Sequence, residues 1–163
     1  MAERPKDAEE KELEALEAAQ VDHLGVPLWR ASRAYVGLMM AGYRRLGYHD
    51  LTESHTGLLP HLDIGGTRIT TLAARAGLTK QAIGQMVSDL ETRGYVTRAP
   101  DPNDARAKIV RYTKKGRRFL HDGQVVKQEL HARCRALVGE KNFAAFADQL
   151  GTLADQLEKA ALD

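Results

Sequence analysis

The chain lacks features that several classes of protein require. Its one cysteine, Cys134, leaves no disulfide within the chain. Aromatic residues make up only 6% of the sequence, and no apolar run approaches the roughly 20 residues that a membrane span needs. The N-terminus is acidic and has no apolar core of the kind found in a secretory signal. These absences predict a cytoplasmic protein with no membrane partner.

The common enzyme motifs are missing as well. There is no serine elbow, no phosphate-binding glycine loop and no His-Glu metal helix. His49, His55 and His61 recur every six residues, whereas metal ligands on one helix face need a spacing near three or four. Cys134 is interpreted as a packed or semi-exposed thiol. We therefore predict no catalytic residue, no metal site and no cofactor.

Charge is distributed unevenly along a chain whose net charge is only +2. Residues 66–118 hold twelve Lys and Arg against four Asp and Glu, a balance of +8, whereas residues 1–20 hold three against seven, a balance of −4. A basic middle is typical of a protein that binds a polyanion such as DNA. Scattered surface bases would give the same totals, so charge alone leaves both interpretations open.

Most of the chain has helical periodicity. Residues 6–24 are predicted to form an exposed helical arm, and a second helix is expected from about Val26 to Leu46, with Pro27 in its first turn. Thr52 is the predicted N-cap of a third helix that ends at Gly65-Gly66, before a very short strand at Ile69. From Phe119 onward the chain is helical again. Its last apolar positions are spaced by three and four, which predicts a partner helix and favours a homodimer: Phe143, Phe146, Leu150, Leu153 and Leu157.

The segment 70–93 predicts two short helices joined by a tight turn. Thr70 caps the first, Thr71–Ala76, and Gly77-Leu78 makes the turn. Thr79 caps the second, which runs to about Arg93. Its inward positions are Ile83, Val87 and Leu90, and its outward positions are Lys80, Gln81, Gln85 and Ser88. This arrangement is typical of a helix-turn-helix whose second helix enters the major groove, although any amphipathic surface helix also turns Lys and Gln outward.

A β-hairpin is predicted directly after this helix. Gly94 ends the helix, Tyr95–Arg98 forms a short strand, and Ala99–Asp104 forms a turn-rich tip. Lys108–Tyr112 returns as the second strand, and Arg98, Arg106 and Lys108 would line the hairpin toward DNA. The predicted fold class is therefore mainly α with a small β-wing, a winged helix-turn-helix between N- and C-terminal dimerisation helices.

These motifs resemble the MarR family of bacterial transcription regulators over about residues 26–158. The resemblance rests on the following segments: Leu51-Thr52, Leu72-Ala73, Thr79–Ile83, Leu90–Arg98, Asp101–Arg106 and Tyr112–Gly116. It implies a homodimeric repressor that binds a pseudo-palindromic operator in double-stranded DNA and is released by a small aromatic or phenolic effector. It also implies that Asp104 and Arg106 fix the wing and reach DNA. The chain departs from the family in its N-terminal extension, in His55 where Gln is common, and in Tyr112 where Leu is usual.

Two sets of site residues are predicted. The DNA-binding set is Thr70, Thr79, Lys80, Gln81, Gln85, Ser88, Arg98, Asn103, Asp104, Arg106 and Lys108. The effector-pocket set, which could equally be dimer core and solvated arginines, is Trp29, Arg30, Arg33, Tyr35, Tyr43 and His55. A winged helix used for protein interaction, or for nonspecific architectural DNA binding, is the alternative function.

Four segments are expected. Residues 1–25 form an acidic helical extension, and residues 26–65 form the N-terminal dimerisation helix with a support helix. Residues 66–112 form the winged helix-turn-helix, and residues 113–163 form the C-terminal dimerisation helices.

Overall fold

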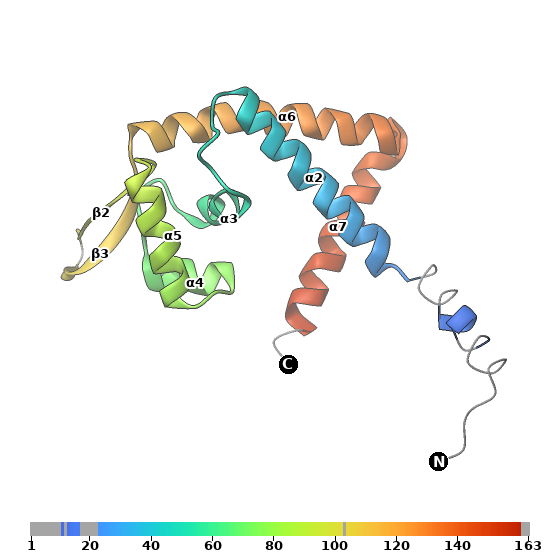
Figure 1. Ribbon diagram of the computed structural model, residues 1–163, viewed down its shortest axis with the longest axis horizontal. Helices are drawn as coiled ribbons and strands as arrows, with labels where there is room; N and C mark the ends of the chain where they lie inside the picture. The colour runs from blue at the N-terminus through green and yellow to red at the C-terminus, as the bar shows by residue number, and fades with distance from the viewer. Residues whose placement is uncertain (1–10, 12, 17–22, 103, 161–163) are drawn as a thin grey trace, which may run out of the picture. The chain divides into compact units, whose positions relative to one another are not determined.

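The computed structural model describes residues 11, 13–16, 23–102 and 104–160. The chain divides into two compact units, residues 1–38 and residues 39–163. Helix α2, Gly25–Arg45, begins in the first unit and ends in the second. Figure 1 shows the order of the elements along the chain.

In the described part of the first unit, all regular secondary structure is α-helix. Residues 11 and 13–16 of the predicted arm are helical, and the rest of 6–22 lies outside the described residues. The α2 helix begins within a residue of its predicted start and has Pro27 in its first turn, where a missing N–H costs nothing. Most of its large side chains are exposed within this unit, among them Trp29 and Tyr35.

The second unit begins with the end of α2 and a short support helix. Thr52 caps helix α3, Glu53–Leu58, by accepting the N–H of His55, and the His55 ring accepts the N–H of Thr52 in return. The predicted continuation to Gly65 is wrong. The α-helix ends at Leu58, and a 3-10 turn, Leu59–His61, follows around Pro60, because proline cannot donate the next helical hydrogen bond.

Helices α4, Ile69–Ala76, and α5, Lys80–Thr92, form the helix-turn-helix. Gly77 joins them in the left-handed conformation, with φ of 62°. Two predictions at the start of α4 are wrong. The short strand β1 is Thr67–Arg68 rather than Ile69, and Arg68 rather than Thr70 occupies the N-cap position. Pairing of β1 with a distant strand holds Arg68 extended, and the helix starts directly after it at Ile69, two residues before the predicted Thr71.

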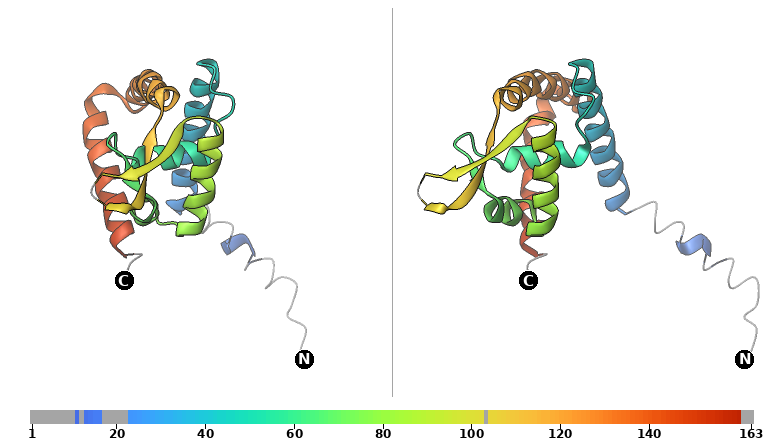
Figure 2. Two further views of the ribbon diagram at one scale, coloured as in Figure 1. Left: turned by 90° about the vertical axis from the view of Figure 1, so that its left-hand side faces the viewer. Right: turned by 60° about the vertical axis from the view of Figure 1, so that its left-hand side comes forward.

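The wing is a longer hairpin than predicted. Strand β2, Val96–Asp101, pairs antiparallel with β3, Asp104–Tyr112, and β3 lies between β1 and β2 in the sheet. The predicted loop from Ala99 to Asp104 is therefore mostly strand. Pro100 is tolerated because β2 is an edge strand, where a missing N–H breaks no ladder. Figures 1 and 2 show the hairpin projecting from α4 and α5.

Two long helices follow the wing. Thr113 caps α6, Lys114–Val138, and Gly139 separates it from α7, Glu140–Ala160. Phe143 at the start of α7 is buried against α6, where its ring meets His131. Farther along the predicted stripe, Phe146, Leu150 and Leu157 are exposed in the single chain.

The core of the second unit lies beneath the recognition helix and extends to α6. Ile83, Val87 and Leu90 are essentially fully buried, as the helical spacing predicted. An aromatic cluster continues the core toward α6, with ring centroids 5.0 to 6.3 Å apart; it consists of Tyr43, Tyr48, Tyr95 and Phe119. The mainly helical fold with a small β-wing is confirmed.

The start of α6 makes the closest backbone approach in this core. A Cβ on Gly116 would lie 2.0 Å from the carbonyl oxygen of Tyr95. We expect Gly116→Ala to lower the free energy of unfolding in urea by about 1–3 kcal/mol, because the backbone must move apart. Gly151→Ala is the matched control, because its Cβ would meet nothing within 4 Å and should raise stability by up to about 1 kcal/mol. Equal stability of the two variants would contradict this packing.

Candidate nucleic-acid interface

The recognition helix α5 separates its core face from its outer face. Thr79 accepts the N–H of Ala82 at 3.2 Å and so caps the helix start. Behind the helix, three apolar side chains anchor it in the core. On the other side Lys80, Gln81, Gln85 and Ser88 are all exposed. The helix therefore presents amide, ammonium and hydroxyl groups of the kind that pair with base edges and phosphates.

The remaining predicted DNA contacts lie at different places in this unit. Thr70 is exposed within the first turn of α4. Lys108 is exposed on β3, opposite Pro100. Asp104 begins β3 and interacts with Arg68 at 3.4 Å. Asn103 and the side chain of Arg106 lie outside the described residues, so their contact with DNA stays a prediction.

Arg98 lies on the predicted wing strand, but its side chain points to the recognition helix. Its backbone N–H and its guanidinium both donate to the carboxylate of Glu91. The guanidinium also donates to the Ser88 hydroxyl at 2.9 Å and to the carbonyl of Gly84 at 3.2 Å. Arg98 thus ties the wing to α5. A phosphate contact by the same side chain stays a prediction.

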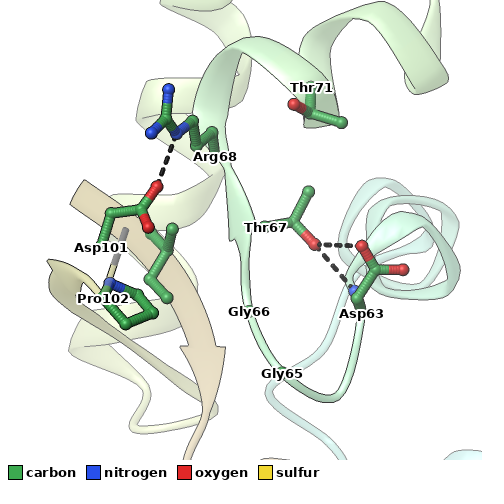
Figure 3. Close-up of a pocket in the computed structure, with 9 residues that line it drawn as sticks. Asp63, Gly65, Gly66, Thr67, Arg68, Thr71, Asp101 and Pro102 are labelled. Carbon is green, nitrogen blue, oxygen red and sulfur yellow. Dashed lines mark hydrogen bonds and ion pairs between the residues drawn. The ribbon is translucent and has the colours of Figure 1, made fainter. Parts of the chain in front are cut away.

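A second link, which the sequence analysis missed, joins the wing tip to the start of α4. Arg68 donates to Asp101 at 2.6 Å, and Asp101 is buried although it is charged. The pair lines a cavity of about 300 Å³, and Figure 3 shows the guanidinium of Arg68 directly joined to the carboxylate of Asp101. The Asp101 carboxylate raises the pKa of Arg68, so the guanidinium stays charged. The only indication of this link in the sequence was the carboxylate of Asp101 between two prolines in the wing tip.

His55 connects the support helix to the recognition helix. The ring is buried, its Nδ1 accepts the N–H of Thr52, and its Nε2 lies 2.9 Å from the Asp89 carboxylate. Burial lowers the pKa of His55 below its ordinary value of 6.5, and the Asp89 carboxylate only partly offsets that effect. His55 is therefore neutral near pH 7, with one nitrogen accepting and the other donating.

A hydrogen-bonded cluster joins the residue before the wing, Tyr95, and the segment before α3 to helix α6. Asp50 accepts from the Tyr95 hydroxyl at 2.6 Å and from the Lys115 ammonium at 2.9 Å. Burial opposes ionisation of Asp50, but these hydrogen bonds outweigh it and lower its pKa. Burial and a hydrogen bond to Asp122 raise the pKa of Tyr48 to about 12. Both tyrosines stay neutral donors, so the cluster holds the start of the wing against α6.

The predicted effector-pocket residues are divided between the two units. Trp29, Arg30, Arg33 and Tyr35 lie in the first, exposed there, with the Arg33 guanidinium 4.9 Å from the Trp29 ring. In the second unit, Tyr43 and His55 are buried in the core. A cavity of about 290 Å³ lies beside α5, and its lining includes none of the six: Ser54, Gly57, Leu58, His61, Ala76, Leu78 and Met86. The assignment of the pocket to these six residues stays a prediction.

Three further features bear on function. Cys134 is half-buried and unpaired in any disulfide. Among the described residues, no group of three or more His, Cys, Asp or Glu side chains could hold a metal ion. Within the same part of the chain, no helix is long and apolar enough to cross a membrane.

Comparisons with known proteins agree with this geometry. Residues 49–107 match the model of the MarR family. The chain is similar to the transcriptional repressor CouR bound to a 23-mer DNA duplex, with 27% identity and a TM-score of 0.70 over 83% of this chain and 94% of CouR. It is also similar to CouR from Rhodococcus jostii RHA1 bound to p-coumaroyl-CoA, with 26% identity and a TM-score of 0.66 over 82% and 94% of the two chains.

A third similar structure is the PcaV transcriptional regulator from Streptomyces coelicolor in complex with its natural ligand. It is 25% identical, with a TM-score of 0.63 over 83% of this chain and 94% of PcaV. A search of curated protein sequences gives no match.

Protonation of His55 should weaken the cap of α3 and place a charge in a buried site, a cost that attraction to the Asp89 carboxylate only partly offsets. A second ring proton would replace the acceptor that the Thr52 N–H needs. Because folding lowers the pKa of His55, this residue contributes stability above pH 6.5 that is lost as the pH falls from 6.5 through the folded-state pKa. His55→Gln should fold with the same two hydrogen bonds and lose less stability between about pH 7.5 and about pH 5. Identical pH profiles of the free energy of unfolding would exclude this role.

Proposed function

We propose that this chain, which matches the MarR family model over residues 49–107, is a ligand-responsive transcription repressor that binds a pseudo-palindromic operator as a homodimer. The protein would act in the cytoplasm, where it would bind DNA and catalyse no reaction. The relatives found by comparison are transcription regulators, not enzymes.

The observation that carries this proposal is the outer face of α5 together with the adjacent wing. Exposed Gln81 and Gln85 can each pair with adenine through two hydrogen bonds, and Lys80 can reach guanine or phosphate. The helix start, capped by Thr79, is a site for a phosphate. The charge of +8 over residues 66–118 supplies the sequence-independent attraction to DNA.

The proposal of a homodimer rests on exposed apolar surface. On α7, Phe146, Leu150 and Leu157 continue the stripe that Phe143 begins, and they are 46%, 41% and 54% exposed in the single chain. A monomer would leave this stripe in water, whereas a two-fold partner would cover it with its own copy. One winged helix from each subunit would then read one half of a palindrome.

The effector is proposed as a small aromatic or phenolic compound. CouR has been captured with p-coumaroyl-CoA and PcaV with its natural ligand. In this chain, Trp29 and Tyr35 offer aromatic surface, and Arg30 and Arg33 offer partners for a carboxylate. Binding of such a compound would release the operator only if it favours a conformation with lower affinity for DNA.

Selection from a random duplex pool, followed by affinity measurements across salt, tests the proposal. We expect an inverted repeat with half-sites about 10–11 base pairs apart. Affinity for it should fall roughly a hundredfold or more between about 50 and about 200 mM salt, because phosphate contacts release counterions. Weak binding without an enriched sequence would favour an architectural protein, and no binding would favour a protein-interaction module.

The matched variant in the same selection is Gln81→Ala, which leaves the exposed helix intact. If Gln81 reads an adenine, the variant should enrich a motif with relaxed preference at one position per half-site, a change of about 1–3 kcal/mol. An unchanged motif would remove Gln81 from base reading.

A further inference from the structure

Gly84 stands in the interior of the recognition helix without a conformational reason for glycine. Its φ is not positive, and apart from its chain neighbours and the backbone of its own helix, a Cβ at this position would meet no described atom within 4 Å. Glycine in a helix interior costs about fivefold in the folding equilibrium relative to alanine, which is about 1 kcal/mol. Neither backbone conformation nor internal packing therefore explains this glycine.

The position of Gly84 places it beside the groove-reading side chains. It follows Gln81 by three residues and precedes Ser88 by four, and side chains at these spacings are neighbours on a helix surface. Both of them are exposed. The missing side chain leaves an open space on the surface of α5 between these two, which we call the Gly84 notch. In Figures 1 and 2 the α5 helix lies beside the β2–β3 hairpin. Arg98 on β2 donates to the Gly84 carbonyl at the edge of the notch.

The polar groups around the notch already bind one another. The Gly84 carbonyl accepts from the Ser88 hydroxyl at 2.9 Å and from the Arg98 guanidinium at 3.2 Å. That guanidinium also donates to the Ser88 oxygen at 2.9 Å, and its charge is balanced by Glu91. A group that enters the notch therefore finds the Ser88 proton and the Gly84 carbonyl engaged, and the contact that remains is with the glycine Cα. The notch suits a small apolar group.

The major groove of DNA displays one apolar group, the C5-methyl of thymine. We propose that Gly84 is a specificity-determining residue and that the Gly84 notch receives the methyl group of one thymine in each operator half-site. This inference rests on the proposed function, and it adds a base contact that no side chain of α5 makes. Alanine at this position would place its own methyl group where the thymine methyl lies.

The first test compares the Gly84→Ala protein with wild type on the selected operator. The variant should be more stable toward urea, because the Cβ has free space and alanine favours the helix. Its affinity should nevertheless fall at least about tenfold, as expected for overpacking an interface by one methyl. Gly57→Ala on α3, outside the proposed DNA-contact and dimer surfaces, also has free space around its Cβ, and it should keep its affinity for DNA.

The second test replaces thymine by uracil, one position at a time, in both half-sites. Wild type should lose about fourfold in affinity per half-site at one position, the value of one buried methyl. Gly84→Ala should lose nothing at that same position and should bind the uracil duplex more tightly than the thymine duplex. At all other positions the two proteins should respond alike.

Two results would overturn the inference. Wild-type affinity in Gly84→Ala would mean that DNA does not occupy the notch. If Gly84→Ala loses the same affinity relative to wild type on the thymine and the uracil duplexes at every position, then the group in the notch is not a thymine methyl. Both results require a selected operator that the wild-type protein binds, so neither contradicts the proposed function. Failure to enrich any operator would refute the proposed function itself.

Discussion

The ion pair between Arg98 and Glu91 is the interaction on which the DNA-reading surface depends. Arg98 is on the wing strand and Glu91 is on the recognition helix, so the pair fixes the angle between the two elements. The same guanidinium binds Ser88 and the carbonyl of Gly84, which orders the helix face beside the wing. Arg68 and Asp101 make a similar link from the wing tip to the start of α4. A base-reading helix and a backbone-contacting hairpin can serve one operator only if they hold a constant geometry.

The supports beneath this surface connect it to α6. Asp50 binds Tyr95 at the start of the wing and Lys115 in the first turn of α6. Tyr48 binds Asp122, about two turns further along α6. The aromatic cluster fills the space between these hydrogen bonds. Because α6 leads directly into α7 and its exposed apolar stripe, the spacing between two winged helices in a dimer would follow from the same contacts. A ligand that shifts α6 would therefore change the match to the two half-sites.

Local chemistry made part of this structure predictable. Thr52 and Thr79 cap helices and Gly77 and Gly94 end them, because each effect involves atoms within four residues. The start of α4 and the length of the wing were mispredicted, because both depend on pairing with β3. The β1 residues pair with β3 residues about 40 positions away, and β2 pairs with β3 as an edge strand that can include Pro100. For the same reason, the sequence identified Arg98 as a wing cation but did not indicate that it faces α5. It showed a carboxylate in the wing tip, Asp101, but did not indicate that Arg68 is its partner.

Groove-specific footprinting of the selected duplex tests most directly the central claim, that α5 and the wing bind DNA together. Methylation of guanine N7 reports the major groove, and hydroxyl-radical cleavage reports the minor groove and the backbone. The account predicts a block of N7 protection in each half-site, with an adjoining stretch of hydroxyl-radical protection where the wing lies, repeated about one helical turn apart. Hydroxyl-radical protection that is continuous along the duplex, with guanine N7 reactive throughout, would contradict it.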